Sequence, residues 1–215
     1  MESALREGSG APGLRLIETL GWDGTGLVRG ERHLARLARS ASALGWPCDV
    51  AMARARLYQG RGAPARLRLT LGRAGDIEVT AGEIAPLAAP WRVVLSERRL
   101  ASGDPWLRLK TTQRPLYFAT RAALPEGVDE VLFQNERGEV CEGTITTVFF
   151  DAGAGLCTPP LASGLLPGIL REELLETGQA REDVLRAEDL PKVRLWVGNS
   201  LRGLIPARWV GPGAA

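Results

Sequence analysis

The chain has 215 residues, of which 45% are hydrophobic and 24% are charged, and its formal net charge is +2. This composition is typical of a globular protein with one large or two small domains, and it excludes a disordered or fibrous chain. No stretch approaches the roughly 20 consecutive apolar residues of a membrane helix. The first residues lack the apolar core of a signal peptide, so we expect a cytoplasmic protein without membrane association.

Cysteine and histidine are scarce, which limits the available chemistry. Cys48, Cys141 and Cys157 are odd in number and widely spaced, so we expect reduced thiols rather than disulfides or a zinc site. His33 is the single histidine, which argues against a histidine-rich metal site and a Ser-His-Asp triad. We therefore expect no bound metal, and acid–base chemistry that uses Lys, Glu, Asp, Tyr or a cofactor.

Apolar periodicity predicts the elements of the first half. Strands are expected at 14–22, 65–71 and 76–80, and helices at 30–44 and 50–58. Arginines alternate with leucines from Arg66 to Leu71, as in a half-buried strand whose arginines face solvent. This interpretation competes with a basic nucleic-acid footprint and is the simpler one, so we expect no nucleic-acid partner.

The segment 82–91 is rich in proline and alanine and has no clear period, so it predicts a connection between domains 1–89 and 90–215. The second half is expected to contain a strand at 91–97, a helix at 113–124, a hairpin within 128–150 with a further strand from 144, a short strand at 155–160, a helix at 165–178 and two strands within 194–210. Strands dominate without a βαβ rhythm, which predicts an α+β fold.

Lys110 is one of two lysines in a chain with 25 arginines. Unlike arginine, lysine can lose its proton near neutral pH and act as a nucleophile or base. The pattern therefore makes Lys110 a candidate catalytic amine, although a surface lysine would look the same.

Three further features complete a possible site. Arg36 lies beside the apolar face of the first helix, Glu142 lies within an apolar strand, and the segment 165–170 opens a helix whose free N–H groups could bind an anion. Each has an ordinary structural alternative: a solvated arginine, an ion-paired or solvent-facing acid, and a common helix start. Together they permit pyridoxal 5'-phosphate, which needs an amine, a carboxylate and a phosphate site.

The order of motifs resembles the class IV, or fold type IV, aminotransferases, a family that includes branched-chain and D-amino-acid aminotransferases and 4-amino-4-deoxychorismate lyase. The motifs are ET, HLARL, K-x-x-x-R, VDEVLFQNERGEVCEGT, LCTPP, LLPGILR and GNS, and they extend from about residue 16 to residue 207. The resemblance implies a two-domain α+β fold like that of D-amino-acid aminotransferase, with a small N-terminal domain and a barrel-like C-terminal domain that carries the lysine. It also implies a homodimer.

The resemblance implies a role for each matching residue. Lys110 would be the Schiff-base lysine, Arg36 the phosphate arginine and Glu142 the partner of the pyridine nitrogen. The backbone of Ile169 and Leu170, together with Ser200, would complete the phosphate site. Apart from the resemblance, a lyase reaction needs a proton donor for its leaving group, and Thr19 is a candidate for this role. Arg114 and Arg202 are candidates for a substrate carboxylate, and each could equally be structural.

The spacing of Lys110 and Arg114 is similar to the lyase branch, so the resemblance favours conversion of 4-amino-4-deoxychorismate to 4-aminobenzoate and pyruvate in the folate pathway. The alternative is an aminotransferase of branched-chain or D-amino acids. A third possibility is an inactive cofactor-binding protein or a basic interaction module. In two places the chain departs from the family pattern: the leader before Glu18 is short, and Thr147-Val148-Phe149 replaces a motif that begins with asparagine.

Overall fold

The computed structural model describes residue 5 and residues 7–60 and 62–212, and these form two compact units. Unit 1 contains the described residues up to Pro86 together with Leu109–Gln113. Unit 2 contains Leu87–Arg108 and the described residues from Arg114 onward. No helix in these ranges has the length and apolar character needed to cross a membrane.

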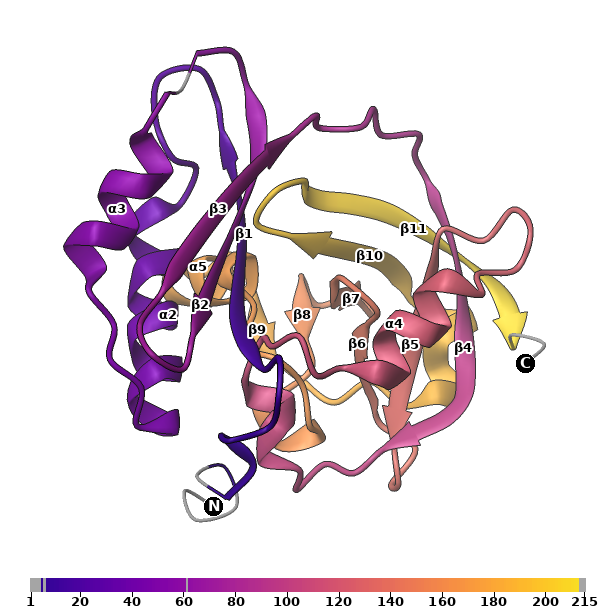
Figure 1. The fold of residues 1–215 in the computed structure, drawn as a ribbon. Helices are drawn as coiled ribbons and strands as arrows, with labels where there is room; N and C mark the ends of the chain where they lie inside the picture. Colours follow the sequence, from indigo (N-terminus) through magenta and orange to yellow (C-terminus); the bar gives the residue numbers. More distant parts are fainter. Residues whose placement is uncertain (1–4, 6, 61, 213–215) are drawn as a thin grey trace. The chain divides into compact units, whose positions relative to one another are not determined.

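Unit 1 is a three-stranded antiparallel sheet with two helices against it (Figure 1). Its elements are β1 (Arg15–Trp22), α2 (Gly30–Leu44), α3 (Val50–Tyr58), β2 (Ala65–Gly72) and β3 (Ile77–Gly82). The alternation predicted for β2 is confirmed: Leu67, Leu69 and Leu71 are fully buried, whereas Arg66 is exposed and Arg68 is partly exposed. Gly45, in the left-handed conformation, ends α2 as expected.

The segment Leu109–Gln113 belongs to unit 1, although the sequence predicted Lys110 in the C-terminal domain. Ile17 donates its N–H to the Lys110 carbonyl at 2.8 Å, and Thr112 donates its N–H to the Arg15 carbonyl at 2.9 Å. The segment thus runs antiparallel to β1, with Leu16 opposite Thr111. This pairing joins residues nearly a hundred positions apart, and no local pattern in the sequence indicates it.

Unit 2 is built on an eight-stranded sheet. Its strands are β4 (Trp91–Leu100), β5 (Glu130–Asn135), β6 (Val140–Gly143), β7 (Thr147–Asp151), β8 (Cys157–Thr158), β9 (Arg181–Glu182), β10 (Arg194–Asn199) and β11 (Gly203–Pro212). Its helices are α4 (Pro115–Ala122) and α5 (Ile169–Glu176), with short 3-10 turns η1 (Pro105–Arg108), η2 (Leu161–Ser163) and η3 (Ala187–Lys192). The further strand predicted from residue 144 begins at Thr147, because residues between Gly143 and Thr147 form a turn.

Six of these strands close into a barrel in the order β10-β11-β4-β5-β6-β7, and β7 pairs back with β10 (Figure 1). Closure leaves few free strand edges. The main apolar cluster of the unit draws on most of these strands and includes Val93, Leu132, Val148 and Val197, all fully buried. The barrel therefore offers a rigid frame for side chains at its strand ends.

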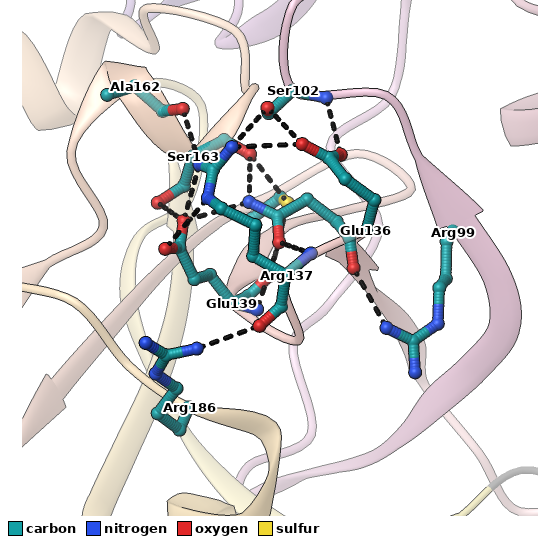
Figure 2. Close-up of polar contacts among 10 residues, drawn as sticks. Arg99, Ser102, Glu136, Arg137, Glu139, Ala162, Ser163 and Arg186 are labelled. Carbon is teal, nitrogen blue, oxygen red and sulfur yellow. Dashed lines mark hydrogen bonds and ion pairs between the residues drawn. The ribbon is translucent and has the colours of Figure 1, made fainter.

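A polar network fastens the turn between β5 and β6, as Figure 2 shows. Arg137 donates from Nη2 to Glu139 Oε2 at 2.7 Å and to the Ala162 carbonyl at 2.9 Å, and from Nη1 to Glu136 Oε1 at 2.9 Å. The Ser163 hydroxyl donates to Glu139 Oε2 at 2.9 Å. The hydrogen bond from Arg137, opposed by desolvation, lowers the pKa of Glu139 to about 2. The network ties the hairpin to η2.

Candidate active site

Lys110 and Thr19 lie on the same face of the unit 1 sheet. Lys110 stands opposite Ile17 in an antiparallel pairing, and residues that face each other in such a pair share a face. Thr19 is two residues beyond Ile17 on β1 and so presents its side chain on that face too. Glu18, between them, points to the opposite face, where α2 packs. The register thus brings the candidate amine and the candidate proton donor to one side.

Lys192, the other lysine, has the surroundings of a surface residue. Its Nζ donates to Asp189 Oδ1 at 2.7 Å within η3, and its side chain is 67% exposed. The hydrogen bond to Asp189 raises the pKa of Lys192, which favours the charged ammonium. A permanently charged amine is a poor nucleophile, so Lys110 is the better candidate of the two.

Arg36 is buried against Glu18 rather than solvated. Its Nε donates to Glu18 Oε1 at 2.8 Å and its Nη2 donates to Oε2 at 2.6 Å, a bidentate pair of the strong, geometrically specific kind. His33 Nδ1 lies 2.6 Å from the same Oε2. The sequence placed Arg36 beside the apolar face of the helix but did not identify Glu18 as its partner. The role of Arg36 as a phosphate ligand stays a prediction.

Burial and ion pairing act in opposite directions on Glu18. Burial alone would raise the pKa of its carboxyl group, because the charged form loses its hydration. The charge of Arg36 and the hydrogen bonds from His33 and Arg36 outweigh this and lower the pKa from 4.5 to about 2. Glu18 is therefore an anion at neutral pH and neutralises Arg36 within unit 1.

In unit 2, Glu142 on β6 is buried and hydrogen-bonded on both carboxylate oxygens. Oε1 accepts from Arg114 Nη2 at 2.9 Å and from the Tyr117 hydroxyl at 2.6 Å. Oε2 accepts from the Leu166 N–H at 3.1 Å. Of the two possibilities that the sequence left open, the buried and ion-paired one is thus correct.

Arg114, predicted to bind a substrate carboxylate, has contacts of another kind. Its guanidinium lies 3.6 Å from the centre of the Tyr117 ring while it pairs with Glu142, and its side chain is 9% exposed. Burial and the negative charge of Glu142 raise the pKa of Tyr117, so its hydroxyl remains a proton donor to the carboxylate. The predicted substrate role of Arg114 remains untested.

The helix α5 begins after Gly168, which has no side chain that could cap the first N–H groups. The role of the Ile169 and Leu170 backbone as phosphate ligands stays a prediction. A Cβ at Gly168 would lie 2.5 Å from Thr147 Oγ1, so only glycine allows this close approach. Thr147, which the sequence analysis noted only as a departure from the family pattern, therefore places a hydroxyl beside this N-terminus.

Strand register brings Glu142, Thr147 and the region of Ser200 to the same part of the barrel. Glu142 faces Thr147 across β6 and β7, and Thr147 faces Gly198 across β7 and β10. Ser200 follows directly after β10 and is buried. Leu170 packs close to Gly198, because a Cβ there would lie 2.9 Å from Leu170 Cδ2.

The turn that carries Ser200 is held by Asn199. Its Oδ1 accepts the N–H of Leu201 at 3.2 Å and that of Arg202 at 3.0 Å. Its Nδ2 donates to the Ile145 carbonyl at 3.3 Å, which links this turn to the turn between β6 and β7. The guanidinium of Arg202 lies 5.9 Å from the Trp91 ring centre.

A buried acid that the sequence analysis did not single out, Glu130, organises the turn between β6 and β7. Its Oε1 accepts from the Thr144 N–H at 3.0 Å, and its Oε2 accepts from the Ile145 N–H at 3.2 Å and the Thr146 hydroxyl at 2.8 Å. The carboxylate is fully buried. Since this turn begins directly after Glu142, Glu130 fixes the end of the strand that carries it.

The donor set of unit 2 suits pyridoxal phosphate. The register of β6 and β7 places a buried carboxylate opposite Thr147, whose hydroxyl lies beside the start of α5, and a carboxylate and a helix N-terminus are the kinds of group that a ring nitrogen and a phosphate need. In the described ranges, no group of three or more His, Cys, Asp or Glu side chains could hold a metal ion.

The class that fold and site define is that of fold type IV enzymes. The family model of amino-transferase class IV matches residues 15–210, and the chain belongs to this family. The protein is therefore an enzyme of a pyridoxal phosphate-dependent family of aminotransferases and lyases.

Three relatives illustrate the match. A Schizosaccharomyces pombe protein, provisionally named an aminodeoxychorismate lyase, is 34% identical over 176 residues, which cover 78% of this chain and 76% of that protein. A Mesorhizobium loti structure, provisionally named an amino-acid aminotransferase, is 47% identical with a TM-score of 0.85 and covers 92% of this chain and 100% of its own. The branched-chain amino acid aminotransferase of Escherichia coli shares the fold, with 20% identity, a TM-score of 0.76, and coverage of 93% of this chain and 78% of that one.

Proposed function

We propose that the protein is a lyase that converts 4-amino-4-deoxychorismate to 4-aminobenzoate and pyruvate, a step of the folate pathway. The observation that supports this most directly is the similarity to the lyase-named yeast protein over 78% of the chain. The spacing of Lys110 and Arg114, which resembles that of the lyase branch, supports it from the sequence.

The proposed site divides the work among the candidate residues. Pyridoxal phosphate, bound to the Lys110 amine, would accept the electrons released from the substrate. Glu142 would hold the ring nitrogen, and Arg36 would contribute to the phosphate site. On the barrel, Ser200 and the first N–H groups of α5, from Ile169 and Leu170, would bind the phosphate.

In the lyase reaction, the substrate amine would first replace the Lys110 amine on the cofactor, and the freed Nζ of Lys110 would remove the proton from the carbon that bears the substrate amine. The C–O bond on the neighbouring carbon then breaks, and the ring becomes aromatic. The departing enolpyruvate takes up a proton, for which we propose Thr19 as donor, and becomes pyruvate. Arg202 would bind a substrate carboxylate; Arg114 is the other candidate for that role.

An aminotransferase of amino acids is the second candidate, and a specific observation favours it. The Mesorhizobium loti structure, named an amino-acid aminotransferase, is 47% identical to this chain over the whole of its own length. In that reaction Lys110 would remove the same proton but return it to the cofactor, so that the amino group is transferred and a keto acid leaves. The two reactions thus differ in the fate of the amino group, which stays on the product 4-aminobenzoate in the lyase reaction and is transferred in the other.

We further propose that the enzyme acts as a homodimer in the cytoplasm, on a small amino substrate with a carboxylate, and binds no nucleic acid. These proposals rest on the family resemblance and on the alternation of arginine with leucine in β2.

The test is a direct comparison of products. Purified protein with pyridoxal phosphate is given 4-amino-4-deoxychorismate, and 4-aminobenzoate is followed by its fluorescence and pyruvate by coupled lactate dehydrogenase. In parallel, branched-chain and D-amino acids are offered with 2-oxoglutarate. Equal amounts of 4-aminobenzoate and pyruvate without amino transfer support the lyase. Glutamate formed from an amino acid, without aromatic product, supports the aminotransferase, and neither product supports an inactive cofactor-binding protein.

A further inference from the structure

The carboxylate of Glu142 is held in one orientation by donors from two separate segments. Arg114 and Tyr117 come from the start of α4, and the Leu166 N–H comes from the segment before α5. All three donors meet a side chain that is 4% exposed. Because both oxygens are engaged, the carboxylate cannot rotate without losing at least one hydrogen bond.

The donors are themselves fixed by packing. The Arg114 guanidinium stacks on the Tyr117 ring, and that ring packs against Phe133 with 4.9 Å between ring centres. Tyr117 and Phe133 belong to one buried apolar cluster. On the other side, Arg108 Nη1 donates to the Leu165 carbonyl at 2.9 Å, which holds the segment that presents the Leu166 N–H. A site residue supported in this way keeps its geometry without help from a ligand.

We propose that Arg114 and Tyr117 are positioning residues that orient Glu142 toward the cofactor ring nitrogen, and that Arg114 is not the substrate carboxylate ligand. This inference rests on the proposed role of Glu142. A substrate anion at Arg114 would compete with Glu142 for the same guanidinium. The buried Glu142 carboxylate would then lose its ion pair with Arg114, which is costly.

The two roles of Arg114 predict opposite changes in binding. We compare R114M and Y117F with R114K, which restores a cation, and with R98M, which removes an exposed arginine of β4. Equilibrium dialysis of the apoprotein gives the dissociation constant of pyridoxal phosphate. Absorption spectra of the cofactor-loaded protein over a range of pH report the environment of the ring.

In the positioning role, R114M and Y117F weaken cofactor binding about tenfold or more, because each removes a hydrogen bond to a charged group. The pH dependence of the spectrum shifts in both variants, R114K recovers part of the affinity, and R98M behaves as wild type. In an E142Q background R114M and Y117F lose most of their effect, because they act through Glu142. Circular dichroism confirms folding, and Y117F keeps the test open if R114M does not fold.

The opposite result is equally clear. If R114M leaves cofactor affinity and spectrum unchanged but raises KM for the carboxylate substrate, Arg114 is a substrate ligand and the inference is wrong. Additive effects of R114M and E142Q on cofactor affinity would also overturn it. Failure of the proposed lyase activity is distinguished separately, because the wild-type enzyme would then form no 4-aminobenzoate and pyruvate, whereas the cofactor affinities of the variants are measured without substrate.

Discussion

Replacing Glu18 by glutamine should destabilise unit 1 by several kcal/mol. The substitution keeps the shape of the side chain but removes the charge that Arg36 and His33 contact at 2.6–2.8 Å. Arg36 would then be a buried cation without its carboxylate, and breaking such a pair typically costs about 3–5 kcal/mol. The lowered pKa of Glu18 reflects the same contacts and is of the same order: a decrease from 4.5 to about 2 corresponds to about 3 kcal/mol at 1.36 kcal/mol per unit.

The same pKa predicts how the effect depends on pH. Because the folded-state pKa is lower than the unfolded one, the stabilisation is fully present above about pH 4.5 and is lost as the pH falls towards 2. Other carboxylates titrate in both proteins, so the difference in unfolding free energy between wild type and E18Q isolates Glu18. That difference should be largest at pH 7 and should shrink between pH 4.5 and 2.

Urea unfolding followed by circular dichroism measures the difference, and hydrogen exchange of β1 and α2 amides assigns it to unit 1. E31Q is the matched control, because Glu31 on α2 pairs with Arg54 through a side chain that is 74% exposed. Exposed pairs contribute about 0–1 kcal/mol. If E18Q were as stable as E31Q at pH 7, or if its difference from wild type did not change with pH, the buried ion pair would not stabilise unit 1.

Three further substitutions test other parts of the molecule. K110R should lose the label left by borohydride reduction in the presence of pyridoxal phosphate, whereas K192R should keep it; a label that persists in K110R would remove Lys110 from the site. G143A should lower the free energy of unfolding by about 1–3 kcal/mol, because its Cβ would lie 2.4 Å from Thr146 Oγ1. G103A is the control, because a Cβ at Gly103 would have no atom within 4 Å. Equal thermal midpoints of the two variants would contradict this prediction. E139Q should lower the urea midpoint at pH 7, and the difference in midpoint from wild type should decrease as the pH falls towards 2, because the pKa of Glu139 is lowered to about 2. A difference that does not change with pH would count against a stabilising role of the network in Figure 2.

Elements with strong local patterns could be predicted from the sequence. The alternation in β2 and the helical spacing in α2 each describe one buried face, and burial of that face largely decides the conformation. The hairpin expected within residues 128–150 is formed by β5 and β6. The motif order is a separate signal, and its resemblance to the class IV aminotransferases implied the two-domain α+β fold.

The partners of charged side chains could not be predicted in this way. Glu142 meets Arg114 across 28 positions, and Arg36 meets Glu18 across 18, so each pair depends on how a helix packs against a strand. Pairing of the Lys110 segment with β1 is likewise a long-range contact. The energetic cost of burying a charge predicts that a buried acid has a cationic partner. Which cation is the partner depends on the tertiary structure, and the sequence pattern does not show it.

Covalent and non-covalent cofactor binding should be separable, because the proposed residues fall into different units. Glu142, Thr147, Ser200 and the start of α5 all belong to unit 2, where the register of β6, β7 and β10 fixes them. Lys110 belongs to unit 1, beside β1. The barrel contacts do not depend on the lysine amine, so K110R that fails to take the borohydride label should still bind pyridoxal phosphate reversibly in equilibrium dialysis. Loss of both kinds of binding in K110R would show that the barrel contacts alone do not hold the cofactor.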